Sequence, residues 1–158
     1  MILGIYHVNI NVSSLERSIA FYELLGFKVL HTFNEVGTPS LDRGLGLAYT
    51  NTRAAFMGLG NSPYETVLDV VEWNEPKTKV RDIELSEIGM PRLCLRVKGL
   101  DQEMARLSQR GIEFVSSPQR LDHLARSPRF VLCRDPDGLV VEMVEFGHVE
   151  AAGADAAA

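Results

Sequence analysis

The chain has 158 residues, 46% of them hydrophobic, which is enough for one core and too few for two domains of usual size. Its net charge of -5 comes from acids and bases scattered along the sequence, so we expect no surface for phosphate backbones and no nucleic-acid partner. No apolar run approaches the roughly 20 residues that span a bilayer, and the amino terminus lacks a signal-peptide pattern. We therefore expect a cytoplasmic protein with no membrane partner. Its two cysteines, Cys94 and Cys133, lack CxxC spacing and are expected to be reduced thiols.

The stretch HVNINVSSLERSIAFYELLGFKV, which begins at His7, predicts a strand followed by a helix. Residues alternate in polarity first, as in a half-buried strand, and helical spacing then continues up to Gly26. Gly26 is suited to the left-handed position that follows a helix. Ser13 stands three residues before Glu16, so we expect a capping box at the start of this helix.

Three further strands are expected in the first half of the chain. We place them around LGLAYT (45–50), around AAFMGLG (54–60) and at LDVVEW, which begins at Leu68. This half is longer than the second, and we expect the extra residues to form a long loop within 31–53. Long loops of this kind often cover binding sites.

The second half of the chain repeats the same order of elements. RLCLRVKGLDQEMARLSQRGIEF, which begins at Arg92, aligns without a gap to the stretch from His7, at an offset of 85 positions. Strands are expected around FVSSPQ (114–119), around RFVLCRD (129–135) and at VEMVEF from Val141, with a tight turn at 135–138. VEMVEF matches LDVVEW at an offset of 73 positions. We therefore predict a single domain, 1–147, made of module one (1–76), a connector (77–90) and module two (91–147), followed by a disordered tail (148–158).

The opening HVNINVSSLERSIAFYELLGF, the late RDPDGLVVEMVEF and the two-module repeat resemble the vicinal oxygen chelate superfamily over nearly the whole chain. That superfamily includes glyoxalases, bleomycin-resistance proteins and ring-cleaving (extradiol) dioxygenases. The resemblance implies an α+β fold in which two tandem βαβββ modules form curled mixed sheets with a cleft between them. It also implies a small-molecule substrate or ligand in that cleft, and a homodimer.

Members of this superfamily take metal ligands from the first and last strand of each module, and the resemblance carries these positions to His7, Asp69, Arg92 and Glu142. His7 and Glu142 are ligand types that suit Ni, Co, Mn, Zn or Fe, and Asp69 is a shorter ligand or a base. Arg92 cannot be a ligand, because a guanidinium has five donors, no acceptor and a permanent charge. Two hypotheses stay open. Either His7, Asp69 and Glu142 hold a divalent metal, with Asp69 and Glu142 as catalytic groups, or Arg92 takes the place of the metal and neutralises the carboxylates.

Strand alternation adds candidates for substrate binding. If His7 faces the cleft, Asn9 and Asn11 face it too, while Tyr6 is expected in the core. The same alternation turns Arg92, Cys94 and Arg96 toward the cleft. Arg92 is then a clamp for an anionic group of the substrate, and Arg96 either assists it or is a charge at the strand end.

Aromatic and histidine side chains complete the set of candidates. Trp73 and Phe146 occupy equivalent positions near the ends of the last strands, where they either wall a substrate pocket or close the modules. Phe56 and Met57 are further candidates for such a wall. His123 is a candidate for a lid or for proton transfer, whereas His31 is given no role.

Three functions are consistent with these residues. The leading hypothesis is a metal-dependent lyase or isomerase that chelates two substrate oxygens and stabilises an enolate while a carboxylate moves a proton, as glyoxalases and epimerases of the superfamily do. The alternative is a metal-free protein that binds or sequesters a small molecule, as bleomycin-resistance proteins do. An extradiol-type dioxygenase ranks last, because it needs two histidines and the resemblance supplies only His7.

Overall fold

A computed structural model of the chain describes residues 1, 3–60, 66–79, 82, 84–86, 88–89, 92–122 and 127–147. The expected tail at 148–158 lies outside these described residues. The chain forms two compact units. The first unit comprises Met1–Asp82 with Asp135–Asp137, and the second unit comprises Ile83–Arg134 with Gly138–Ala158. No helix in the described ranges is both long and apolar enough to cross a bilayer.

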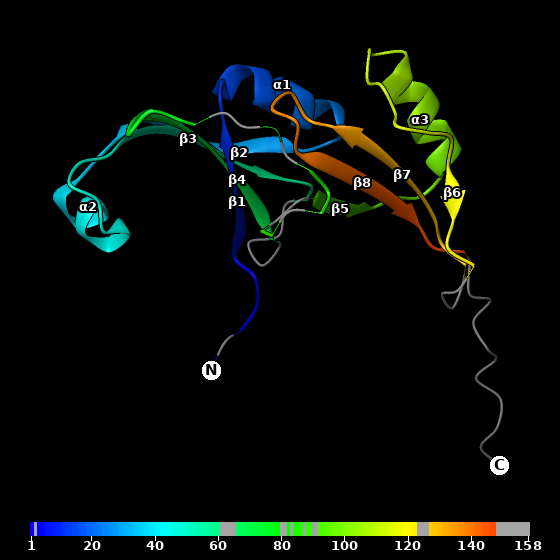
Figure 1. Cartoon of the computed structure of the whole chain (residues 1–158), viewed down its shortest axis with the longest axis horizontal. Helices are drawn as coiled ribbons and strands as arrows, with labels where there is room; N and C mark the ends of the chain where they lie inside the picture. Colours follow the sequence, from blue (N-terminus) through cyan, green and yellow to red (C-terminus); the bar gives the residue numbers. More distant parts are fainter. Residues whose placement is uncertain are drawn as a thin grey trace. The chain divides into compact units, whose positions relative to one another are not determined.

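The first unit is a four-stranded mixed sheet with one helix packed on it (Figure 1). Its strand order is β1-β4-β3-β2, with β1 parallel to β4 and the other pairs antiparallel. Tyr22 and Phe21 of the helix are buried together with Val12, Met57 and Val70 of the sheet. Its elements are β1 (His7–Val12), α1 (Leu15–Leu24), β2 (Lys28–Val36), α2 (Pro39–Leu45), β3 (Asn51–Gly58) and β4 (Val67–Glu75).

The second unit repeats this arrangement, with the strand order β5-β8-β7-β6. β5 pairs with β8 in parallel, and Arg92 lies opposite Val140, just as His7 lies opposite Val67 in the first unit. The repeat and the α+β fold of two βαβββ modules are therefore confirmed. Its elements are β5 (Arg92–Arg96), α3 (Leu100–Ser108), β6 (Gln119–Arg120), β7 (Arg129–Arg134) and β8 (Val140–Glu145).

The middle of the first unit differs from the prediction. The expected strand around LGLAYT is wrong, because β2 begins directly after α1 and the segment 39–45 is helical. The Thr38 side chain caps this short helix by accepting a hydrogen bond from the Leu41 amide at 3.2 Å. Pro39 begins the helix and Gly46 ends it at φ +69°. In the second unit β6 is also shorter than the expected FVSSPQ strand, and Phe114 forms only an isolated bridge to Cys133.

The start of α1 is also one residue later than expected. The Ser14 side chain is the cap, and it accepts from the Arg17 amide at 3.4 Å. Ser13 is occupied elsewhere, because both its amide and its hydroxyl donate to the Asp137 carboxylate, at 2.9 and 2.5 Å. The predicted capping box is therefore wrong. The left-handed position after the helix is confirmed, with Gly26 at φ +94°.

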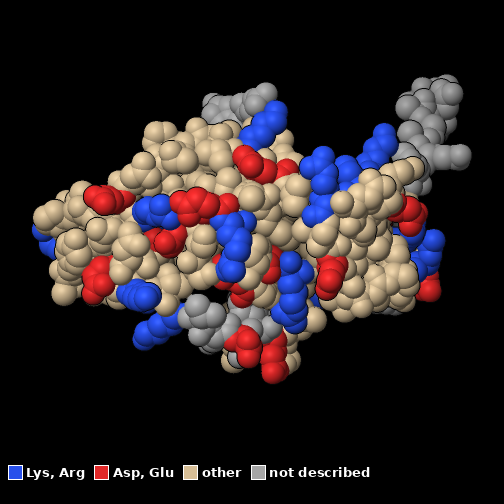
Figure 2. Space-filling view, turned by 90° about the horizontal axis from the view of Figure 1, so that it is seen from above, with Lys and Arg blue, Asp and Glu red and all other residues tan. Residues whose placement is uncertain are grey.

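Figure 2 shows how charged side chains are distributed on one face of the molecule. On the face shown in Figure 2, Lys and Arg side chains are interspersed with Asp and Glu side chains. This mixture agrees with charges that are scattered along the sequence rather than gathered in blocks.

Candidate functional site

β1 presents a polar face on the side of the sheet opposite α1, which we call the outer face of the first sheet. His7, Asn9 and Asn11 are exposed, while Ile10 and Val12 are buried. The predicted alternation of β1 is therefore confirmed. Tyr6 is an exception, since it is 66% exposed rather than in the core. It precedes the first residue of β1, so the alternation of the strand does not extend to it.

His7, Asn9 and Asp69 come together on this outer face. The parallel pairing of β1 with β4 places Asn9 opposite Asp69. The Asn9 amide nitrogen donates to Asp69 Oδ2 at 3.2 Å, and His7 Nε2 lies 4.0 Å from the same oxygen. An imidazole, an amide and a carboxylate thus converge on one point, where they can hydrogen-bond a ligand or contribute two ligands to a metal.

Trp73 lies further along the same outer face. Its indole Nε1 donates to Asn11 Oδ1 at 2.7 Å, so the structure brings these two predicted residues together. The hydrogen bond satisfies the polar end of the indole and leaves its ring in a fixed place at the end of β4.

The equivalent positions of the second unit hold a different pair. Arg92 Nε lies 3.1 Å from Glu142 Oε2. Glu142 is only 8% exposed, whereas the Arg92 side chain is 52% exposed. The guanidinium therefore neutralises a buried carboxylate and still reaches solvent. A buried carboxylate needs such a counter-charge, because desolvation penalises its ionised form.

Arg96 and Phe146 also form a contact in the second unit. The guanidinium carbon of Arg96 lies 5.9 Å from the centre of the Phe146 ring, at the outer limit of a cation–π interaction. These residues are the counterparts of Asn11 and Trp73 at the two repeat offsets. Each unit thus pairs the third outward residue of its first strand with the aromatic residue near the end of its last strand.

Cys94 lies opposite Glu142 in the β5–β8 pair. Partial burial of the sulfur, and secondarily the Glu142 carboxylate, hold the pKa of the Cys94 thiol above its usual range, although Arg92 opposes this shift. A thiol with a raised pKa is a weak nucleophile and a weak metal ligand at neutral pH. This environment gives no support to a catalytic or ligating Cys94.

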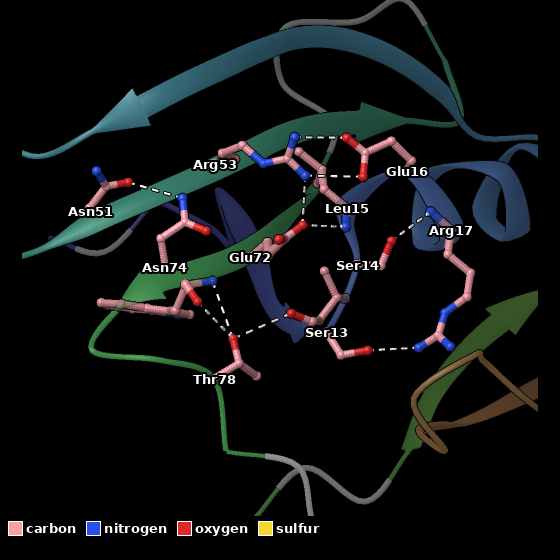
Figure 3. A network of polar contacts seen from close by, with 12 residues as sticks. Ser13, Ser14, Leu15, Glu16, Arg17, Asn51, Arg53, Glu72, Asn74 and Thr78 are labelled. Atoms are coloured by element: carbon pink, nitrogen blue, oxygen red, sulfur yellow. Dashed lines mark hydrogen bonds and ion pairs between the residues drawn. The ribbon is translucent and has the colours of Figure 1, made fainter.

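A network of charges, which the sequence analysis did not identify, anchors α1 to β4 (Figure 3). Arg53 on β3 pairs with Glu16 in the first turn of α1 and with Glu72 on β4, each at 2.8 Å. Glu72 in turn accepts a hydrogen bond from the Leu15 amide at 2.7 Å. The hydrogen bond from Arg53 is the main reason why the pKa of Glu16 lies below its usual range.

The second unit repeats this network with its own residues. Arg129 on β7 donates to Asp101 in the first turn of α3, at 2.6 and 2.8 Å, and lies 3.7 Å from Glu145 on β8. Glu145 accepts from the Leu100 amide at 3.3 Å. The hydrogen bond from Arg129 likewise lowers the pKa of Asp101. The repeat offsets relate Glu16 to Asp101 and Glu72 to Glu145, which was a signal available in the sequence.

The sequence-based prediction also missed most members of a row of aromatic rings on the first unit. Phe56 lies opposite Asp69, and His31 lies opposite Phe56, so both share the outer face with Asp69. Phe33 is 4.4 Å from His31 and 5.1 Å from Phe56, measured between ring centroids. Phe56, a candidate for the wall of a substrate pocket, lies on the outer face, whereas Met57, the other candidate, is fully buried on the opposite face. His31 and Phe33 went unrecognised because β2 was expected to be a loop.

Comparison with known proteins defines the class of this fold. The chain belongs to the Glyoxalase/Bleomycin resistance protein/Dioxygenase superfamily, which it matches over residues 4–143. The sequence-based resemblance to the vicinal oxygen chelate proteins is thereby confirmed. No protein of curated function matches the chain by sequence.

Several solved structures share this fold. A glyoxalase family protein from Bacillus cereus has a TM-score of 0.78 and 22% identity, with 94% of this chain and 97% of that chain covered. The trypanothione-dependent glyoxalase I of Leishmania major has a TM-score of 0.63 and 21% identity, with coverage of 90% and 86%. An antibiotic-binding protein from Streptomyces sp. CB03234 has a TM-score of 0.63 and 23% identity, with coverage of 92% and 98%. The fold therefore serves both glyoxalases and antibiotic-binding proteins.

The superfamily often binds divalent metals, and the residues of this chain fit such an ion only in part. His7 and Asp69 are suitable ligand types, and they lie close together. In the second unit the fit fails, because Arg92 stands where the resemblance expects a ligand, and its guanidinium already neutralises Glu142. Within the described ranges, His, Cys, Asp and Glu side chains form no group of three that could hold a metal. His123, the other candidate, lies outside the described residues.

Proposed function

We propose that this protein binds a small molecule without the help of a divalent metal, as the bleomycin-resistance members of its superfamily do. The observation that carries the proposal is the ion pair between Arg92 and Glu142, at 3.1 Å. It occupies the two positions of the second unit from which metal ligands are expected. The chemistry of a site depends on its residues rather than on its fold. This ion pair is therefore stronger evidence about metal binding than membership of the superfamily is.

The charges of this pair argue against a cation beside Glu142. A guanidinium stays protonated at every physiological pH, so its positive charge cannot be removed to admit a metal. A divalent ion that took Glu142 as a ligand would be repelled by Arg92 and would have to displace it. The ion pair therefore gives Glu142 the counter-charge that a metal supplies in other members.

Arg92 also has the properties of a ligand-binding residue. The contact with Glu142 is made by Nε, and a guanidinium has five donors in all. About half of the side chain is exposed, so its remaining donors can reach a bound molecule. We expect a carboxylate, phosphate or enolate-like oxygen of the ligand to meet Arg92, because a guanidinium binds such groups in a bidentate manner.

A metal-dependent lyase or isomerase is the second candidate, and the group formed by His7, Asn9 and Asp69 favours it. A metal at that group would polarise substrate oxygens, and Asp69 would act as ligand or base. Glu142 would contribute only if Arg92 moved away from it.

The metal content of the untagged protein separates the two candidates. The protein is incubated in turn with Ni, Co, Mn, Zn and Fe salts, passed through a desalting column and analysed by elemental mass spectrometry. We expect far less than one ion per chain, with no change in the His7→Ala and Glu142→Ala variants. Near-stoichiometric metal that disappears in both variants would overturn the metal-free proposal.

A gain of metal binding is the complementary test. Arg92→His replaces the guanidinium with a ligand and gives the second unit the same imidazole–carboxylate pair as the first. We expect this variant to take up more Zn or Ni than the wild type. Arg92→Gln is the matched control, because it removes the charge without adding an imidazole. Equal uptake by both variants would show that the charge alone excludes the metal.

The superfamily resemblance also leads us to propose a homodimer, since many small members pair their modules across a twofold axis. Size-exclusion chromatography with light scattering measures the mass of the protein in solution. A mass of one chain at micromolar concentration would contradict this part of the proposal.

A further inference from the structure

Five rings form a continuous row across the outer face of the first sheet. Neighbouring ring centroids lie between 4.4 and 6.3 Å apart, and most pairs meet edge to face. The row crosses from β1 to β3 and β2 without interruption, over three strands that are far apart in sequence. Its members are Tyr6, His7, Phe56, Phe33 and His31.

A second group of rings in the same unit shows what such contacts look like in the core. Phe21, Tyr22 and Phe27 also meet edge to face, at 5.2 and 5.9 Å, and all three are buried. In the outer row, by contrast, Tyr6 is 66% exposed and His31 is exposed, while Phe33 and Phe56 are half-buried. The outer row therefore adds little to the core, and its exposed ring surface is available to a ligand.

A polar group borders this row on one side. Asp69 lies directly opposite Phe56 on the neighbouring strand, and it accepts from the Asn9 amide at 3.2 Å. His7 belongs to both features, because its ring is 6.1 Å from Phe56 and its Nε2 is 4.0 Å from Asp69. A ligand on the rings thus meets a carboxylate at its edge. An ionised carboxylate accepts hydrogen bonds and repels other anions, so that edge of the ligand carries a donor.

We infer that the ligand of this protein contains a planar aromatic ring system with a hydroxyl or amino group at its edge, and that it stacks on the ring row with that donor directed to Asp69. The inference rests on the proposed binding function and names its ligand class. Flat rings suit this surface because exposed aromatic faces attract other rings beyond the simple burial of apolar area. A donor at the edge completes the recognition because Asp69 offers only acceptors.

Two uncharged probes with the same carbon skeleton test the role of a flat aromatic ring. 2-Naphthol has two flat aromatic rings and one hydroxyl, and decahydro-2-naphthol has the same hydroxyl on a saturated skeleton. Both are titrated into the full-length protein by isothermal calorimetry. We expect 2-naphthol to bind at least about 10-fold more tightly, since the saturated probe keeps its hydrophobic area but loses the ring contacts. Equal affinities, or no binding of 2-naphthol at millimolar concentration, would overturn the inference.

Two exposed tyrosines provide a matched pair of variants. Tyr6 belongs to the row and Tyr49, at 57% exposure, has no part in it. We expect Tyr6→Leu to weaken 2-naphthol binding about 2- to 10-fold and Tyr49→Leu to leave it unchanged. Phe33→Leu is a second variant within the row, with its folding checked by circular dichroism. Identical behaviour of Tyr6→Leu and Tyr49→Leu would contradict stacking on this row.

The hydrogen-bond donor at the edge of the ligand is tested separately. We expect Asp69→Ala to weaken 2-naphthol binding more than it weakens naphthalene binding. The reverse order would contradict the position of the hydroxyl.

The proposed function and the ligand class can fail independently. If the protein proves to hold a metal but the tyrosine variants behave as expected, the metal-free proposal fails and the ligand class stands. If Tyr6→Leu changes the mass in solution and 2-naphthol does not bind, a second copy of the chain covers the row and the inference is wrong.

Discussion

In the first unit His7 on β1 and Asp69 on β4 share the outer face of the sheet, whereas the same two positions of the second unit hold Arg92 and Glu142. The backbone pairing is the same in both units, so the difference lies in the side chains alone. The first pair is long, at 4.0 Å, and can still accept a partner. The second pair is short, at 3.1 Å, and is already neutralised. The same strand positions thus carry an imidazole and a carboxylate with a long contact in the first unit and a short ion pair in the second.

The salt-bridge networks that link each helix to its sheet are, by contrast, alike in the two units. Arg53 and Arg129 both link an acid in the first turn of the helix to a glutamate on the last strand. These contacts position the helix against the sheet. On the outer faces, an amide–indole pair in the first unit corresponds to a guanidinium–phenyl pair in the second.

The largest expected effect comes from removing one partner of the second-unit pair. Arg92→Leu leaves the Glu142 carboxylate buried without its counter-charge, and we expect the free energy of unfolding to fall by about 2 kcal/mol. This value is below that of a fully buried pair because Arg92 is half exposed and water can replace it. His7→Leu breaks a 4.0 Å contact and the ring contacts of an exposed imidazole, and leucine keeps apolar contact with the neighbouring rings, so we expect a change below about 0.5 kcal/mol. Urea denaturation measures both values.

The double variant Arg92→Leu/Glu142→Leu is the control for this comparison. It removes the buried charge together with its partner, so most of the lost stability should return. Equal costs for Arg92→Leu and His7→Leu would show that the two pairs do not differ in the way the distances indicate.

The next largest effect concerns the salt-bridge networks of Arg53 and Arg129, which the two units have in common. Arg53→Met and Arg129→Met each remove the arginine that neutralises a glutamate of the last strand, Glu72 or Glu145, while the backbone amides that donate to it remain. We expect each variant to lose about 1 kcal/mol of unfolding free energy, and the two losses to be similar. Arg110→Met, at an exposed arginine after α3, is the control. A large loss in one variant only would show that the networks are not equivalent.

The same variants predict a change in pH dependence. The pKa values of Glu16 and Asp101 are lowered in the folded state, mainly by hydrogen bonds from Arg53 and Arg129. A lowered folded-state pKa contributes stability that is present above the unfolded-state pKa and is lost as the pH falls through the folded-state pKa. The difference in urea midpoint between pH 7 and pH 3 should therefore be smaller in each variant than in the wild type. An unchanged difference would mean that these pairs do not contribute.

Much of the fold was predictable, because it rests on a repeat. The two offsets placed α1 and α3, the first and last strand of each unit and the glycine after α1. The prediction failed in the longer middle of the first unit, where a strand was placed around LGLAYT although Thr38, Pro39 and Gly46 carried the signals of a short helix. The capping serine was also misplaced by one residue, because its competitor for hydrogen bonds, Asp137, lies far away in sequence.

The candidate site was predictable only as far as it follows the repeat. The pairs of Asp69 with Asn9 and of Arg92 with Glu142 lie on first and last strands, which align without ambiguity. His31 and Phe33 lie on β2, outside the aligned segments, so no pattern placed them beside Phe56. Arg53 and Arg129 also lie on third strands, and a salt bridge across three elements leaves no local signature in sequence.

The smallest expected effect uses Cys94 as a reporter of charge in the second unit. The Glu142 carboxylate raises the pKa of this thiol and Arg92 lowers it, so the two substitutions should act in opposite directions. Glu142→Gln removes the negative charge, favours the thiolate and should speed alkylation by iodoacetamide at pH 7 roughly two- to fivefold. Arg92→Gln should slow it. Peptide mass spectrometry separates Cys94 from Cys133, which is fully buried and serves as the internal control.

This measurement also bears on the difference between the units, because a cation bound at Glu142 would act on the thiol as a second positive charge. If Glu142 is held by Arg92 alone, the alkylation rate of the wild type should not change when Zn or Ni is added or when a chelator removes it. A metal-dependent rate that is lost in Glu142→Gln would place an ion beside Cys94. Glu142 would then be a metal ligand, and the contrast between the pair of His7 with Asp69 and the ion pair of Arg92 with Glu142 would no longer hold.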